Sequence, residues 1–167
     1  MHGIMEEFEG TVLRDMTRTW NWIGWSPDQA IRLNMYINPG EFAAYNTGTP
    51  RIGRGLNSGI NLNLQFAGKL QAGFNGNYSS LYETDGSGKI YSGWIWRSVI
   101  RYNANRFVQA RLISQWNQFN NSYLVQPLLQ YQPSPFTIVY IGSSTAYNGN
   151  TTSQIFAKAQ VTLRPFK

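Results

Sequence analysis

The chain has 167 residues, which is enough for one domain with a hydrophobic core and too few for two large domains. It contains no cysteine and a single histidine, His2, so disulfide frameworks, thiolate sites and multi-histidine metal sites are excluded. Charged residues make up 13% of the chain and aromatic residues 15%, which argues against disorder, and the basic residues behind the net charge of +6 are spread singly, which argues against a nucleic-acid partner.

The neutral polar residues Asn, Gln, Ser and Thr supply about 30% of the chain. Few charges, many aromatics and many neutral polar side chains are typical of a transmembrane β-barrel, whose strands alternate lipid-facing and lumen-facing residues. The first ten residues lack the basic and apolar regions of a signal peptide. We therefore expect an exported form to be a processed product or a piece of a longer chain.

All predicted elements are strands. Residues 1–29 form an N-terminal segment with one possible strand, over residues 10–25, and residues 30–167 form barrel strands. The eight strands predicted in the second part cover residues 31–38, 58–66, 70–82, 90–102, 106–118, 122–132, 136–146 and 153–164. Nine strands in total do not suit a single-chain bacterial barrel, whose strand number is even. The chain is therefore expected to be the C-terminal part of a larger barrel or, as a second option, a complete eight-stranded barrel with a plugging N-terminal segment.

The period-two alternation is clearest over residues 59–78. Apolar residues alternate there with Asn, Gln and Gly, and pairing Phe66 with Leu70 across a three-residue turn makes one face apolar or glycine throughout. A second hairpin follows, in which pairing Tyr102 with Val108 would place Trp94 opposite Trp116. Trp94 and Tyr102 lie eight residues apart, about 20 Å of height for tilted strands. Aromatics at both ends of such a band match the two interfacial girdles of a membrane barrel.

The connections are expected to alternate in length. Short turns are predicted near residues 67–69, 104–106 and 132–135, and longer connections near 39–57, 83–89 and 143–152, with 119–122 as an exception. Bacterial barrels have short periplasmic turns and long extracellular loops, so the short turns are assigned to the periplasm.

The alternation assigns side chains to two faces. The lumen-facing candidates are cationic or amide residues: Arg97, Arg101, Arg111, Lys158, Arg164, Gln65, Asn75 and Gln109. The lipid-facing and girdle candidates are apolar: Leu62, Leu64, Phe74, Trp94, Trp96, Tyr102 and Trp116. If a water-filled passage exists, its cationic and amide wall favours anionic or polyhydroxylated solutes. The alternative is that these polar residues only solvate or plug the lumen.

No catalytic site, metal site or cofactor is predicted. Glu83 and Asp85 share a glycine-containing loop that is typical of a solvated hairpin tip, and the chain has no G-x-S-x-G motif. The glycines of residues 53–59 miss the dinucleotide-binding spacing and no helix is predicted after them.

The closing segments carry a family resemblance. LVQPLLQYQPSPFTIVYIGSSTAY and QIFAKAQVTLRPF resemble the C-terminal strands of large bacterial outer-membrane proteins that pair an N-terminal domain similar to family 9 carbohydrate-binding modules with a long β-barrel. The resemblance covers residues 30–166 and implies an outer-membrane location. The chain lacks the N-terminal domain, so no carbohydrate-binding residue carries over, and its terminal aromatic, Phe166, is followed by Lys167.

The sequence therefore predicts an antiparallel up-and-down transmembrane β-barrel, or part of one, in a bacterial outer membrane. Its expected role is that of a non-catalytic pore, transporter or membrane anchor. The expected partners are outer-membrane lipid, the barrel-assembly machinery, and the remaining strands of a larger barrel or other subunits of a membrane complex. A soluble calyx-like barrel that binds a small ligand is the alternative, and an outer-membrane enzyme is a third option.

Overall fold

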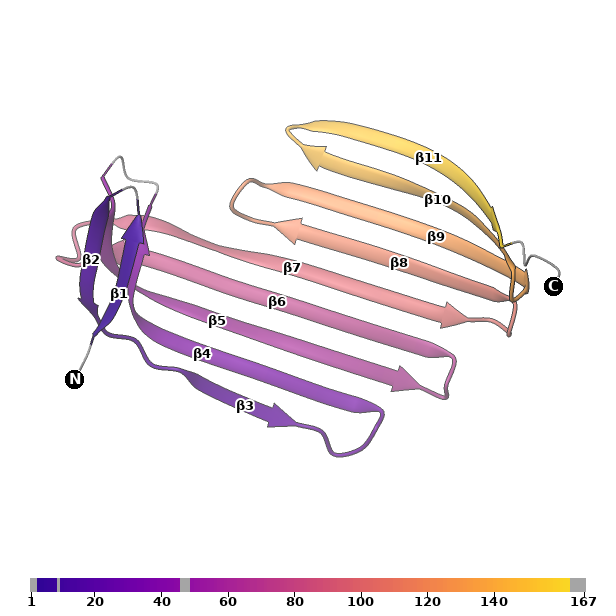
Figure 1. The fold of residues 1–167 in the computed structure, drawn as a ribbon, viewed down its shortest axis with the longest axis horizontal. Helices are drawn as coiled ribbons and strands as arrows, with labels where there is room; N and C mark the ends of the chain where they lie inside the picture. Colours follow the sequence, from indigo (N-terminus) through magenta and orange to yellow (C-terminus); the bar gives the residue numbers. More distant parts are fainter. Residues whose placement is uncertain (1–2, 9, 46–48, 163–167) are drawn as a thin grey trace, which may run out of the picture.

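The computed structural model describes residues 3–8, 10–45 and 49–162, and these residues form eleven strands. Figure 1 shows the strands in chain order. Their bounds are β1 Ile4–Phe8, β2 Thr11–Met16, β3 Asn21–Trp25, β4 Ile31–Ala44, β5 Arg51–Phe66, β6 Leu70–Glu83, β7 Lys89–Asn103, β8 Val108–Asn117, β9 Ser122–Ser134, β10 Thr137–Asn148 and β11 Asn150–Val161.

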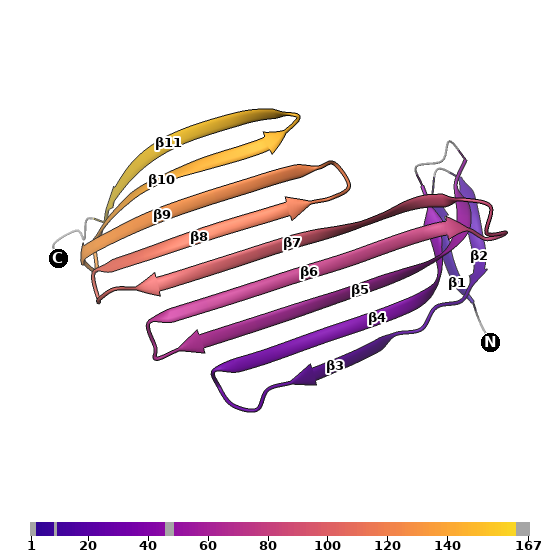
Figure 2. The same cartoon turned by 180° about the vertical axis from the view of Figure 1, so that it is seen from behind.

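Nine of the strands form one sheet in the order β11-β10-β9-β8-β7-β6-β5-β4-β3. Every neighbour in this sheet is the next strand in the chain and runs antiparallel to it, so the topology is up-and-down. The all-β antiparallel prediction is thereby confirmed. The sheet is open, because its edge strands β3 and β11 do not pair with each other, as Figures 1 and 2 show from opposite sides.

The β5–β6 hairpin has the predicted register. Phe66 pairs with Leu70, and the pairing continues without a shift to Gly53 opposite Glu83. The turn between them places Ala67 and Gly68 at positive φ, 46° and 68°, and the Lys69 N–H donates to the Phe66 carbonyl. The glycine lowers the cost of this left-handed conformation.

The predicted register of the β7–β8 hairpin is wrong by two residues. Tyr102 pairs with Ala110, and Trp116 lies opposite Trp96 and not Trp94. The Asn105 side chain explains the difference, because its Oδ1 accepts the backbone N–H groups of Phe107 and Val108 and holds a longer turn. A two-residue slip preserves the parity, so each side chain stays on its predicted face.

Two of the long connections predicted from composition are paired strands. In the region 39–57, β4 continues to Ala44 opposite Arg51, and in the region 143–152 Asn148 pairs with Asn150 around Gly149, whose φ is 76°. Glycine in the region 39–57 allows neighbouring strands to approach closely, since a Cβ on Gly55 would lie 2.1 Å from the Ser80 carbonyl oxygen. The connection near 83–89 is a turn as predicted, whereas the turn predicted at 132–135 lies at residues 135–136.

The N-terminal segment holds three strands where one was expected. β3 pairs with β4, while β1 and β2 form a separate hairpin that lies near the projecting ends of β4–β7 in both views (Figures 1 and 2). A small hydrophobic core forms at this end of the sheet. Phe42, Ala44 and Leu81 are buried there with Ile90 and Tyr91 packed against them, and Leu13 and Met16 of β2 are also buried.

Candidate functional site

The sheet places the sequence-predicted side chains on two opposite faces, which we call the apolar face and the polar face. On the apolar face, Leu62 pairs with Phe74, Leu64 with Ala72, and Trp96 with Trp116. Trp94 and Tyr102 lie on the same face, since they are separated from Trp96 by even numbers of residues along β7. All seven lipid-facing candidates are therefore on one face, and their contact with lipid stays a prediction.

Aromatic side chains gather in two bands across the apolar face. In the first band the Trp94 and Trp96 rings stack at 5.1 Å between centroids, and Tyr78 lies 4.9 Å from Trp94. Trp116 and Tyr123 continue this band across β8 and β9 with their rings 6.2 Å apart. The second band contains Phe66, Tyr102 and Tyr131 near the opposite strand ends. Between the bands lie residues such as Leu64, Ile100 and Leu112, and the hydrogen-bonded pair Ser98 and Ser114.

The polar face carries rows of amide and arginine side chains that run across the strands. One row joins Gln65, Gln71, Arg101 and Arg111 on β5 to β8. A second row, four residues away on each strand, joins Asn61, Asn75, Arg97 and Gln115. The strand register, not the local sequence, brings these side chains together.

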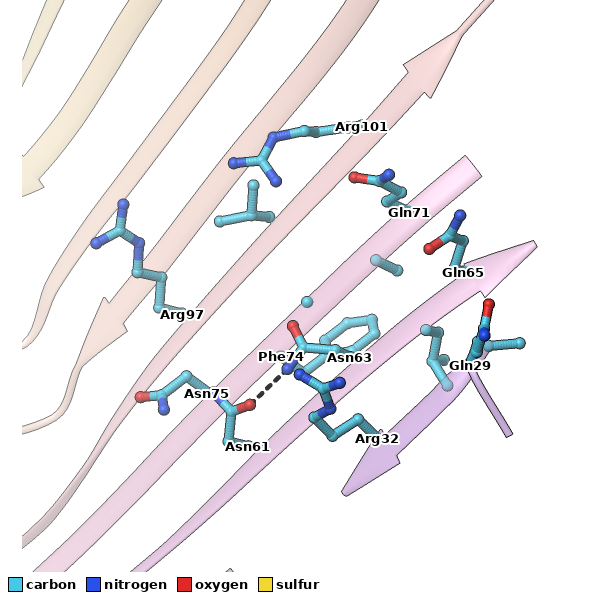
Figure 3. Close-up of a pocket in the computed structure, with 15 residues that line it drawn as sticks. Gln29, Arg32, Asn61, Asn63, Gln65, Gln71, Phe74, Asn75, Arg97 and Arg101 are labelled. Carbon is cyan, nitrogen blue, oxygen red and sulfur yellow. Dashed lines mark hydrogen bonds between the residues drawn. The ribbon is translucent and has the colours of Figure 1, made fainter. Parts of the chain in front are cut away.

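A cavity of about 460 Å³ opens on this face over β4 to β7. Figure 3 shows its polar side chains: Arg97 and Arg101 from β7, Asn75 and Gln71 from β6, Asn61, Asn63 and Gln65 from β5, Arg32 from β4, and Gln29 from the preceding turn. Arg32 reaches toward Asn61 and Asn63 from the side opposite β7 (Figure 3). The cavity is thus lined by three guanidinium groups and six side-chain amides.

Hydrogen bonds order part of the amide lining. Asn63 Nδ2 donates to Asn61 Oδ1 at 2.6 Å, and Asn77 Nδ2 donates to Asn75 Oδ1 at 2.7 Å. Each pair lies on one strand two residues apart, so the amides form short chains along β5 and β6. An ordered amide lining presents donors and acceptors in fixed positions to a polar ligand.

The predicted lumen residues divide into three groups. Gln65, Asn75, Arg97 and Arg101 line the cavity together. Arg111, Gln109 and Lys158 lie on the polar face beyond its lining, where Arg111 pairs with Arg101, Gln109 with Asn103 and Lys158 with Tyr140. Arg164 lies outside the described residues.

Arg32, Gln71 and Gln29 line the cavity but were not among the predicted lumen residues. The alternation of apolar and polar residues along β4 and β6 already places Arg32 and Gln71 on the polar face, so this signal could have identified both as candidates. Gln29 lies in a turn and has no periodic signal. On β9 to β11 this face becomes less polar, with Leu128 beside Gly142 and Gly142 beside Phe156.

Within residues 3–8, 10–45 and 49–162, no group of three or more His, Cys, Asp or Glu side chains could hold a metal ion. The same residues contain no helix long and apolar enough to cross a membrane. The chemistry offered by the site is therefore hydrogen bonding and positive charge. Comparison with protein-family models, with curated proteins and with solved structures finds no match for this chain.

Proposed function

We propose that this chain forms part of the wall of a bacterial outer-membrane β-barrel and acts as a non-catalytic pore, transporter or membrane anchor. The observation that carries the proposal is the exposed apolar face of a long two-faced sheet. Ile155 is 84% exposed, Ile23 59% and Ile141 53%, although all three are aliphatic strand residues. A soluble protein rarely leaves a continuous apolar face of this kind uncovered, whereas a lipid bilayer would cover it.

Strand length and the aromatic bands agree with a membrane setting. A tilted strand needs about 9–11 residues to cross a bilayer. Strands β4 to β11 have between 10 and 16 residues, so each of them is long enough. Trp94 and Tyr102, one from each band, are separated by about 20 Å of height in a tilted strand, close to the thickness of the apolar belt of an outer-membrane barrel.

The open edges favour a barrel that is larger than the present sheet. The nine strands alternate in direction, so the edge strands β3 and β11 run the same way. They could close directly only as a parallel pair. Closure with antiparallel neighbours requires an odd number of further strands, which would also give the even total of bacterial barrels. These strands would come from a longer form of this protein, as in the outer-membrane family that residues 30–166 resemble, or from other subunits.

The first test is the electrophoretic behaviour of the protein in native membranes. An antibody against residues 153–167 is used on boiled and unboiled membrane samples. A band well above 19 kDa that shifts on boiling supports a larger barrel, and a shifting band at 19 kDa supports a small complete one. Antigen found only in the soluble fraction contradicts the proposal and favours the calyx-like binding protein.

A further inference from the structure

The cavity on the polar face contains positive charge that no carboxylate in the described residues neutralises. The salt bridges among these residues involve Arg18, Arg51 and Arg54, and none involves Arg32, Arg97 or Arg101. The sequence has no Asp or Glu after Asp85, so strands β7 to β11 supply no counter-charge. Asp28, in the turn before Arg32, already accepts the backbone N–H groups of Ala30 and Ile31.

Two arginines face each other directly across β7 and β8. Arg101 pairs with Arg111, and like charges in this position destabilise a sheet. The Nε of Arg111 is buried and has no hydrogen-bond partner among the described residues. Gln71 adds an amide on the other side of Arg101. Planar guanidinium groups side by side present the donors that a carboxylate, phosphate or sulfate group binds best.

Gly73 lines the floor of the cavity and adds no side chain of its own to it. It pairs with Asn63 on β5 and with Val99 on β7, midway between Arg97 and Arg101. A Cβ at this position would lie 3.3 Å from Asn63 Oδ1 and 3.9 Å from the Val99 carbonyl oxygen, so the Asn63 side chain borders this point of the floor and a larger residue would crowd it. The arginines therefore border a hollow that a ligand can enter.

We propose that this cavity binds a solute that carries two or more oxyanion groups. Arg101 binds one group together with its cross-strand neighbour Arg111, which lies just beyond the cavity lining, and Arg97 binds the second, while Arg32 faces the same hollow from β4. Arg97 and Arg101 lie four residues apart on β7, about 13 Å between their Cα atoms, and their guanidinium groups also lie apart in Figure 3, so each is assigned its own oxyanion group. The inference rests on the proposed function, since it assigns a solute to the face that would line the barrel.

The test is isothermal titration calorimetry of the protein in a nonionic detergent. The probes are sodium tripolyphosphate, inorganic phosphate and the tricarboxylate tricarballylate. We expect at least one of the two multivalent probes to bind on the order of tenfold more tightly than inorganic phosphate, and the stronger of the two identifies the phosphate or carboxylate chemistry. Absence of binding by both, or equal affinity for inorganic phosphate, overturns the proposal.

Charge-removing variants locate the site. Arg97→Gln and Arg101→Gln should each weaken binding of the multivalent probe on the order of tenfold, whereas Arg97→Lys should retain part of it. Arg106→Gln removes the same charge from an exposed turn outside the cavity, where the guanidinium lies 4.4 Å from the Phe107 ring centroid, and should leave binding unchanged. An equal loss in Arg106→Gln shows nonspecific attraction and contradicts the site. Circular dichroism of each variant is the control for folding.

The titration and the membrane blot test the binding site and the membrane role separately, so either proposal can be contradicted without the other. A protein that shifts on boiling in membranes but binds neither multivalent probe retains the proposed function and loses the site. A protein found only in the soluble fraction that still binds tripolyphosphate through Arg97 and Arg101 keeps the site and loses the membrane role.

Discussion

The two ends of the sheet differ in how they bury apolar side chains. At the end near the N-terminal hairpin, β4 to β7 project beyond β8 to β11, and the last pair of β7 with β8 is Ile95 with Asn117. Leu81 and Met16 are fully buried there. This core has the parity of the polar face, since Leu81 lies six residues from Asn75 on β6. Among the residues that the structure describes, no layer covers the apolar face, and β11 is exposed along its whole length.

Under the proposed membrane role, two environments stabilise one chain. The core of Phe42, Ala44 and Leu81 excludes water with its own side chains, as in a soluble protein. The apolar face needs a surrounding apolar phase to gain the same transfer free energy. Core substitutions should therefore act through cavities, and substitutions on the apolar face should act through their contact with that phase.

The largest effect is expected from Leu81→Ala, because it opens a cavity in the core. We expect the free energy of unfolding to fall by about 2–5 kcal/mol. Leu112→Ala on the apolar face, where Leu112 is 39% exposed, should cost less, about 1–2 kcal/mol, since lipid or detergent can fill the space. Thermal unfolding followed by near-ultraviolet circular dichroism in detergent measures both. Equal losses would show that the apolar face is packed like a core.

A charge on the apolar face gives the next largest effect. Leu62→Arg should lower the free energy of unfolding from lipid vesicles by about 2–4 kcal/mol if Leu62 lies near the bilayer midplane. Asn61→Arg is the matched control, since Asn61 is the next residue and lies on the polar face. Guanidinium unfolding followed by tryptophan fluorescence distinguishes them. Similar costs at the two positions would contradict the assignment of the faces.

Much of the sheet could be predicted from sequence because period two is a strong signal. The assignment of Leu62, Phe74, Arg97 and Arg101 to faces needed only parity, which survived the wrong register of β7 and β8. That register depended on the Asn105 side chain, which periodicity does not report.

Other features could not be predicted because they depend on contacts distant in sequence. The glycines at 53 and 55 favoured a loop in composition, yet they allow close approach of β6 within a paired strand. The cavity brings together residues of β4 to β7, among them Gly73 between Asn63 and Val99, and only the register of these strands reveals that grouping. The β1–β2 hairpin escaped prediction because its strands have only five and six residues.

A moderate, pH-dependent effect is expected at Glu6 of β1, whose carboxylate binds Tyr45 at the projecting end of β4. A hydrogen bond from the Tyr45 hydroxyl lowers the pKa of Glu6 from its ordinary 4.5, and Arg18, whose Nη2 lies 2.5 Å from Glu6 Oε1, lowers it further. A lowered folded-state pKa stabilises the protein above pH 4.5, and this stabilisation is lost as the pH falls through the lowered pKa.

Glu6→Gln should therefore cost about 1 kcal/mol of unfolding free energy at pH 7. The difference from the wild type should shrink below pH 4.5, where the wild-type carboxylate also becomes protonated. Thermal unfolding of both proteins from pH 3 to pH 8 measures the two curves. A constant difference over this range would show that the carboxylate charge contributes nothing.

The smallest effect is expected at Arg54, whose ion pair lies at the same end of the sheet but in solvent. Arg54 Nε lies 3.8 Å from Glu41 Oε1, and the Arg54 side chain is 69% exposed. Glu41 is held mainly by the Thr17 N–H and hydroxyl, at 3.0 and 3.1 Å, and keeps both bonds without the arginine. Arg54→Ala should therefore change the free energy of unfolding by less than about 0.5 kcal/mol, and less still in high salt. A loss as large as that of Glu6→Gln would mean that Arg54 has a partner other than Glu41, because a solvent-exposed pair at this distance cannot supply it.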